Sequence, residues 1–170
     1  MNIDIFKQRR SIRSYEPRQI TQQELDLILE AGTYAPTGMN RQSPVMVAVQ
    51  DPEIIRIIEK ENAAVMGNPE GRPFYGAPTV VVVFADIRVR TGFEDACLVM
   101  GNLMNAASVI GVGSCWIHRA KEVFQTEAGK ALMKKWGLDE NYVGVGTCIL
   151  GYAAESPAAR PRKENYIIRA

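Results

Sequence analysis

The sequence has no marked excess of charge of either sign and no long apolar run. Lys and Arg total 20 against 19 Asp and Glu, so the formal net charge is +1. A nearly neutral chain has no general electrostatic reason to bind nucleic acid or a membrane surface. No apolar stretch approaches the roughly 18 residues of a membrane span, and the first residues, MNIDIFKQRR, lack the apolar core of a signal peptide. We expect a soluble cytoplasmic protein with neither kind of partner.

Side chains that bind metals or attack substrates are also scarce. Cys97, Cys115 and Cys148 are odd in number and widely spaced in apolar segments, which is typical of reduced, buried thiols rather than a disulfide framework or zinc site. The only histidine, His118, has no cysteine or carboxylate at ligand spacing, so we expect no metal. Ser114 lies too close to His118 in a predicted strand for the two to cooperate in hydrolysis.

The usual nucleotide-binding signatures are missing as well. GVGSCW, residues 111–116, follows a predicted helix, whereas a dinucleotide fingerprint follows a strand. No GxxxxGK phosphate loop occurs anywhere in the chain. Any binding of an anion must therefore depend on a local group of residues.

The sequence does contain the material for a packed core. Of its 170 residues, 46% are hydrophobic and 23% are charged, which is typical of a folded globular protein. A chain of this length buries roughly 70% of the surface that it exposes when unfolded. We expect a single domain over residues 1–170.

The pattern of apolar residues predicts alternating helices and strands. Thr21 and Glu24 have the spacing of a capping box at the start of a helix, and the valine run at 79–86 is typical of a central strand covered on both faces. The segment 92–113 is apolar almost all round, which predicts a buried helix. We expect a short N-terminal helix that ends near Ser11 and longer helices over 22–34, 52–64, 92–113 and 121–137. The expected strands are 45–49, 79–86, 114–118 and 142–152, and residues 66–78 are expected to form a loop. Together they predict a layered α/β domain without internal repeats.

Three short motifs could bind a ligand, and each has an ordinary structural alternative. The first, RRSIRSY at 9–15, is either a solvated helix end or a phosphate site in which Arg9 or Arg10 acts with Ser11, leaving Arg13 for a second anionic atom.

The second motif is APTGMNRQSP at 35–44, and the third is the pair Arg160 and Arg162 in the Pro-rich segment that ends the chain. The second motif is either an ordinary loop between a helix and a strand or a set of hydrogen-bond donors for a heterocycle with a polar edge. The third motif is either an exposed basic tail or part of a ligand-binding site. The donors in the second motif would be Pro36, Thr37, Gly38, Asn40 and Gln42. The same terminal segment, 153–170, ends in the strand-like YIIR at 166–169 and either lies over a partner subunit or frays.

These motifs occur together in the order typical of one family. RRSIRSY, ILEAGTYAPTGMNRQSP, GAPTVVVVFAD, MGNLMNAASVIGVGSCWIHRAKE, VGVGTCILGY and RPRK cover nearly the whole chain. In this ordered set the sequence resembles the FMN-dependent nitroreductase family, in particular its short, compact bacterial members. The resemblance implies an α+β fold with a three-layer α/β/α sandwich. It also implies an intertwined homodimer in which the C-terminal extension, 151–170, reaches the partner subunit.

The resemblance further implies roles for the candidate residues. Arg9 or Arg10, with Ser11, Arg160 and Arg162, would bind the FMN phosphate, and Arg13 would lie near the pyrimidine edge of the flavin. The loop residues Pro36, Thr37, Gly38, Asn40 and Gln42 would reach the ring or ribityl chain from the partner subunit. Trp116, Ile117, His118 and Arg119 would pack on one flavin face, with a backbone N–H of His118 or Arg119 near N5.

The implied activity is that of an FMN-dependent oxidoreductase. NADH or NADPH would reduce FMN, which would then reduce a small nitroaromatic, quinone or enone in a ping-pong sequence. The lack of an obvious general acid or base agrees with chemistry performed by a cofactor. Two alternatives remain open, a flavin-binding or sensor protein without turnover and a specialised reductase of the same fold. Arg119 could narrow the pocket, recruit an acidic substrate or point to solvent.

Overall fold

The computed structural model describes residues 3–170 and contains a four-stranded sheet. Its strand order is β1-β2-β4-β3, and each neighbouring pair is antiparallel. The strands are β1 (Val45–Val49), β2 (Thr79–Asp86), β3 (Gly113–Ile117) and β4 (Tyr142–Gly151). The class is therefore α+β, as the resemblance implies.

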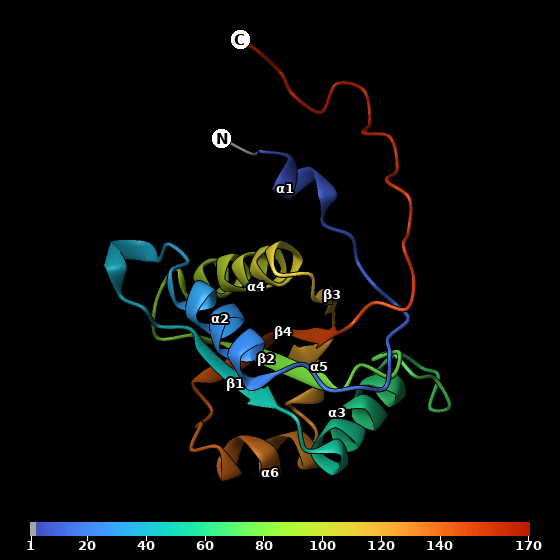
Figure 1. The fold of residues 1–170 in the computed structure, drawn as a ribbon. Coiled ribbons are helices and arrows are strands. Elements are labelled where there is room, and N and C mark those ends of the chain that lie inside the picture. Colours follow the sequence, from blue (N-terminus) through green and yellow to red (C-terminus); the bar gives the residue numbers. More distant parts are fainter. Residues whose placement is uncertain (1–2) are drawn as a thin grey trace.

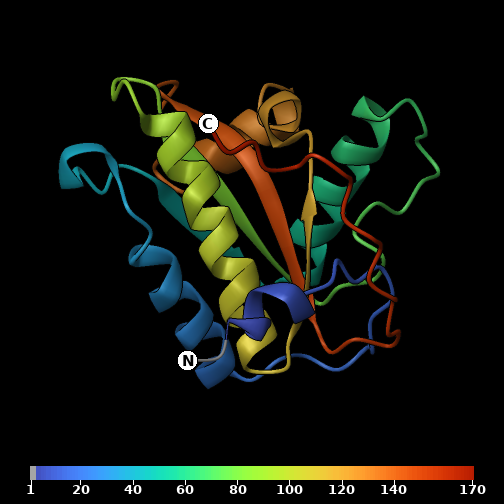
Figure 2. The same cartoon turned by 90° about the horizontal axis from the view of Figure 1, so that it is seen from above.

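Helices cover both faces of the sheet and make three layers (Figures 1 and 2). The bounds are α1 (Asp4–Gln8), α2 (Gln22–Thr33), η1 (Gly38–Asn40), α3 (Pro52–Val65), α4 (Gly92–Val109), α5 (Ala120–Val123) and α6 (Glu127–Lys135). Helices α2 and α4 pack on one face, and α3, α5 and α6 pack on the other. The expected α/β/α sandwich is confirmed.

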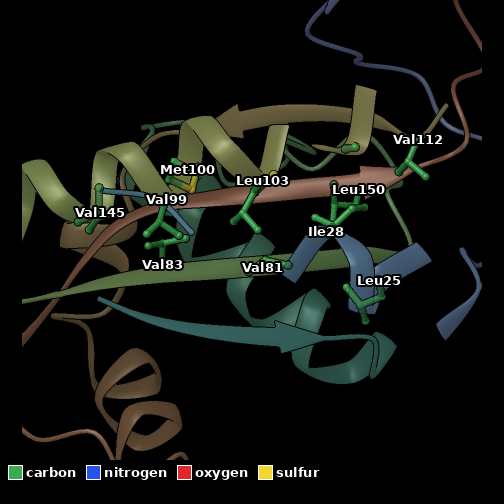
Figure 3. Packing of buried hydrophobic residues seen from close by; sticks show 14 of the residues in the cluster. Leu25, Ile28, Val81, Val83, Val99, Met100, Leu103, Val112, Val145 and Leu150 are labelled. Atoms are coloured by element: carbon green, nitrogen blue, oxygen red, sulfur yellow. The ribbon is translucent and has the colours of Figure 1, made fainter. Parts of the chain in front are cut away.

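Strand β2 is the centre of both cores, because every one of its residues is buried. Val81 and Val83 point toward α2 and α4, where Figure 3 shows Val81 near Ile28 and Leu103 and Val83 next to Val99. The alternate residues, including Phe84, join the other core, since successive strand side chains point to opposite faces. The prediction of a central strand covered on both sides is confirmed.

The N-terminus of α2 is fixed as the sequence predicts. The Thr21 hydroxyl accepts a hydrogen bond from Glu24 N at 3.2 Å, and the Glu24 carboxylate accepts one from Thr21 N at 2.8 Å. Tyr152 also donates to that carboxylate at 2.7 Å. The hydrogen bonds that this carboxylate accepts from Tyr152, from Thr21 N and from the Thr21 hydroxyl lower the pKa of Glu24, the one from Tyr152 most strongly. The capping box thus joins α2 to the end of β4.

Two predicted helices differ from the structure. The expected helix over 121–137 is divided into α5 and α6, because the Thr126 hydroxyl accepts a hydrogen bond from Gly129 N at 3.1 Å and starts a new helix. Helix α4 ends at Val109, and only one of its faces is buried in the chain, while Phe93 and Leu98 are exposed. Its apolar outer face explains why the sequence alone predicts burial all round.

The two ends of the chain differ from the expected elements in smaller ways. Helix α1 ends at Gln8, short of Ser11, and residues 166–169 form no strand. Cys115 and Cys148 are buried as expected, Cys97 is half-buried, and all three thiols are free. No helix within residues 3–170 is both long and apolar enough to cross a membrane.

Both chain ends are attached to the sheet before they leave it. Ile12 N donates to Ser114 O at 3.0 Å at the edge strand β3, and Ala154 N donates to Ser14 O at 2.9 Å. Figure 1 shows α1 and the C-terminal segment extending from the sheet on the same side. These hydrogen bonds hold two basic segments, far apart in sequence, beside each other.

We expect Gly129→Ala to lower the free energy of unfolding by about 1–3 kcal/mol, because a Cβ there would overlap the Val123 carbonyl oxygen. Urea titration at fixed protein concentration measures the change. Ala131→Gly on the exposed face of α6 is the control, with an expected cost of about 1 kcal/mol from helix propensity alone. A stabilising Gly129→Ala would contradict the packing described here.

Candidate functional site

A basic hollow of about 780 Å³ lies between the two chain ends, and we call it the arginine hollow. It is lined by Phe6, Lys7, Arg9, Arg10, Ser11, Arg13, Pro157, Ala158, Ala159, Arg160 and Arg162. None of these lining residues, within the part of the chain that the structure describes, is acidic. The hollow thus brings together the first and third candidate motifs of one chain, and its charge suits an anion.

Arg9 and Arg10 have different surroundings in this hollow. Arg10 Nη1 donates to Lys7 O at 2.6 Å and to Arg9 O at 2.9 Å, so its guanidinium caps the C-terminal end of α1. Arg9 Nη1 is buried and has no hydrogen-bond partner among residues 3–170. A buried donor without a partner costs about 1–3 kcal/mol, which an anionic oxygen in the hollow would recover. The geometry therefore favours Arg9 over Arg10 as the anion ligand.

The other basic residues of the hollow are more exposed. Arg162 Nη2 donates to Arg160 O at 2.7 Å, and both side chains are exposed. Arg13 is also exposed, and its backbone N donates to a carboxylate oxygen of Glu155. This contact is a further link between the N-terminal and C-terminal segments.

A second hollow, of about 330 Å³, shares Arg13 with the first, and we call it the loop hollow. Its walls are the connection between α3 and β2, residues 66–75, and the end of β3 with the residues that follow, 115–119. Trp116, Ile117, His118 and Arg119, the residues expected on one face of a flavin, all line it. Arg13 therefore stands between the phosphate candidates and the candidates for ring contact.

Asn62 of α3 holds the backbone of the loop hollow and is a residue that the sequence analysis missed. It is 0% exposed; its Nδ2 donates to His118 O at 2.8 Å, and its Oδ1 accepts from Arg119 Nε at 3.1 Å. Asn62 shares the buried face of α3 with Ile55 and Ile58. A polar residue at this spacing on an apolar helix face was the signal that could have identified it.

Trp116 is packed into the core as well as lining the loop hollow. An added Cβ at Gly146 would come within 2.5 Å of the indole Nε1, so the ring lies directly across β4 at this glycine. Met100 of α4 contacts the same position. The indole is therefore held in one place by the sheet and by α4.

The second candidate motif lies elsewhere. Gly38 N donates to Asp95 Oδ1 at 3.0 Å, which attaches η1 to the N-terminal end of α4, whereas α1 lies near the opposite end (Figure 2). The 18 residues of α4 span about 27 Å at 1.5 Å per residue. Pro36, Thr37, Gly38, Asn40 and Gln42 are thus not brought to either hollow within one chain.

That loop nevertheless has a well-defined shape. Gln42 N donates to Thr37 Oγ1 at 3.0 Å, and Gln42 Nε2 donates to Asn40 Oδ1 at 3.1 Å. Met39, Asn40 and Gln42 have positive φ values of 55°, 53° and 51°, which cost energy in residues other than glycine. The hydrogen bonds hold this strained turn with its side chains toward solvent, where Met39 is 86% exposed.

The titratable groups near the hollows offer no nucleophile or acid–base pair. Burial raises the pKa of the Cys115 thiol, although Arg13 opposes this shift. Burial likewise raises the pKa of Cys148 to about 12 and the pKa of Tyr15 above its ordinary value. Residues 3–170 contain no cluster of three or more His, Cys, Asp or Glu able to hold a metal. The basic lining residues of the arginine hollow are suited to binding an anion.

Comparison with known proteins identifies relatives over most of the chain. The sequence model of the Nitroreductase family matches residues 6–152. A protein of Archaeoglobus fulgidus, named for NADH dehydrogenase or NAD(P)H nitroreductase activity, is 30% identical over 149 residues, covering 85% of this chain and 80% of its own. The NAD(P)H-dependent FMN reductase of Bacillus subtilis is 26% identical over 176 residues, covering 90% of this chain and 66% of its own. A Bacteroides fragilis nitroreductase with bound FMN has a TM-score of 0.87 at 27% identity, covering 99% of this chain and 97% of that one.

We expect Asn62→Ala to lower the free energy of unfolding by about 2 kcal/mol, because two hydrogen bonds from a buried amide are lost. Urea titration measures this change. Asn68→Ala, at an exposed position of the same hollow, is the control, with an expected change within about 0.5 kcal/mol. Equal effects of the two substitutions would show that Asn62 does not hold the 118–119 backbone.

Proposed function

The chain belongs to the nitroreductase family, and we propose that it is an oxidoreductase that holds FMN and takes electrons from NADH or NADPH. The observation that carries this proposal is the buried, unpartnered Arg9 Nη1 in a hollow without acidic lining residues among those described. This donor set fits a phosphate group, which supplies several strong acceptor oxygens.

The residues of the arginine hollow would divide the work of holding the cofactor. Arg9 would neutralise the phosphate from its buried position, with Ser11, Arg160 and Arg162 contributing further donors. Arg10 would support Arg9 by capping α1 instead of touching the phosphate. Of the two arginines that the sequence analysis leaves open, Arg9 is therefore the phosphate ligand in this proposal.

Arg13 would act on the flavin ring from its place between the two hollows. When bound, FMN would accept a hydride from NADH or NADPH and deliver the electrons to a nitroaromatic, quinone or enone in a ping-pong sequence. A fixed cation at the pyrimidine edge stabilises the negative charge that reduction places there. Arg13 would supply this charge without a proton transfer, because arginine stays protonated.

The peptide between His118 and Arg119 would orient the hydride-accepting side of the ring. Asn62 donates to the His118 carbonyl, and in a trans peptide the following N–H points the opposite way. The Arg119 N–H is therefore directed away from α3. Of the two backbone donors expected near N5, this geometry favours that of Arg119.

The partner that completes the site would be a second copy of the chain. The loop residues 36–42 lie far from both hollows of their own chain, and apolar residues remain exposed along α4, namely Phe93, Leu98 and Val109. A Cβ at Gly101 would meet no heavy atom within 4 Å, so another helix could approach α4 closely there. A sedimentation mass equal to one chain would contradict this dimer.

We expect Arg9→Ala to weaken FMN binding about 10- to 100-fold, because a charge-assisted contact to phosphate contributes roughly 1.5–3 kcal/mol. Arg10→Ala is the matched control and should change the affinity roughly threefold or less, since Arg10 is bonded to the backbone of α1. Fluorescence titration of the apoprotein with FMN gives both dissociation constants. A larger loss for Arg10→Ala would reverse the assignment.

The proposed activity is tested by the absorbance spectrum of the purified protein, followed by anaerobic mixing with NADH or NADPH. We expect a flavin spectrum, retained or restored with added FMN, that either nucleotide bleaches within seconds. A bound flavin that neither nucleotide reduces would identify a binding or sensor protein instead. A protein that binds no FMN would remove the proposal altogether.

A further inference from the structure

The loop hollow carries more positive charge than ring contact requires. Arg13, Arg72 and Arg119 line it together with His118, and no acidic residue does so among those the structure describes. Arg13 is accounted for at the flavin edge, but Arg72 and Arg119 have no such role. Three guanidinium groups that line a hollow of about 330 Å³ produce a positive potential that attracts an anionic group.

Arg119 has a strained backbone, and its guanidinium contacts only neutral groups among those the structure describes. Its φ is 77°, a left-handed conformation that costs a residue other than glycine of the order of 1 kcal/mol. The guanidinium is held by neutral partners, with Nε donating to Asn62 Oδ1 at 3.1 Å and Nη2 lying 3.4 Å from Met66 Sδ. The side chain is thus half-buried and held by neutral partners at the edge of the hollow.

Arg72 is only weakly paired. Its Nε lies 3.9 Å from Glu59 Oε2, the limit of an ion pair, and its side chain is 78% exposed. The other oxygen of Glu59 accepts a hydrogen bond from Phe74 N at 2.9 Å, so that carboxylate chiefly fixes the loop backbone. An exposed pair at this distance contributes little, and Arg72 remains available to a ligand.

An aromatic side chain completes the wall. Tyr75 lines the hollow, has a φ of 53° and remains 40% exposed. Its ring offers an apolar surface to a flat ligand, next to the two cations. A hollow of this size is at the lower end of the range for small-molecule sites, so it suits a one-ring compound or one group of a larger one.

We propose that the loop hollow is a subsite for an anionic group, a carboxylate or phosphate, on the small molecule that reacts over the flavin, with Arg72 and Arg119 as its ligands. The inference rests on the proposed function for its reaction but concerns binding alone. Two sources supply this chemistry: the carboxylate of an aromatic acceptor, or the additional phosphate that distinguishes NADPH from NADH.

Calorimetric titration tests the subsite in two arms, each with a matched pair of ligands. Benzoate against benzamide isolates a carboxylate on a single ring, and NADP⁺ against NAD⁺ isolates the additional phosphate. In at least one pair we expect the ligand with the additional anionic group to bind about 10-fold or more tightly than the ligand without it. The arm that responds identifies the source of the anionic group.

Arg72→Gln and Arg119→Gln should each reduce that affinity ratio about 10-fold. Arg56→Gln, on the exposed surface of α3 and outside the hollow, removes the same charge and should leave the ratio unchanged. Because Arg72 is exposed, its variant tests the ligand role even if Arg119→Gln disturbs the α3 contact. Ratios near one in both arms, or ratios that neither variant changes, would overturn the proposal.

Calorimetry measures ligand binding without flavin reduction, so a failure of the subsite can be distinguished from a failure of the proposed oxidoreductase activity. A protein that holds and reduces FMN but shows no charge preference lacks the subsite alone. A protein that prefers benzoate or NADP⁺ but binds no FMN retains the subsite and loses the proposed reaction.

Discussion

The attachment of both chain ends to one edge of the sheet is the constraint on which the site depends. The backbone of Ile12 is bonded to Ser114 of β3, and Ala154 is bonded to Ser14, so the N-terminal and C-terminal segments lie together. Without these bonds, Arg9 and Arg160 would belong to two separate basic tails. With them, one chain assembles a hollow whose described lining contains no acidic residue.

Two buried polar side chains differ in role: one holds the backbone of the loop hollow, and the other is available to a ligand. Asn62 is fully buried and its amide has partners on both atoms, so it fixes the 118–119 backbone. Arg9 Nη1 is buried without a partner among residues 3–170. Burial of a polar group is tolerated when its hydrogen bonds are made, and an unmade bond next to a hollow indicates a ligand.

Strong local patterns could be predicted from the sequence, whereas contacts across the chain could not. The valine run of β2 and the Thr21 capping box depend on neighbouring residues, and both are confirmed. The sequence analysis missed the break between α5 and α6 because the apolar pattern continues through Thr126. The new helix is marked by a hydrogen bond that the Thr126 side chain accepts. The difference between Arg9 and Arg10 and the role of Asn62 depend on three-dimensional packing, which residue spacing does not determine.

The central claim is that the arginine hollow recognises a phosphate group, and the affinities of FMN and riboflavin for the apoprotein test it most directly. These ligands share the ring and ribityl chain and differ only in the phosphate. If Arg9 recovers its missing hydrogen bond there, FMN binds at least about 100-fold more tightly than riboflavin, because several charge-assisted bonds are added. Equal dissociation constants for the two ligands would contradict the account.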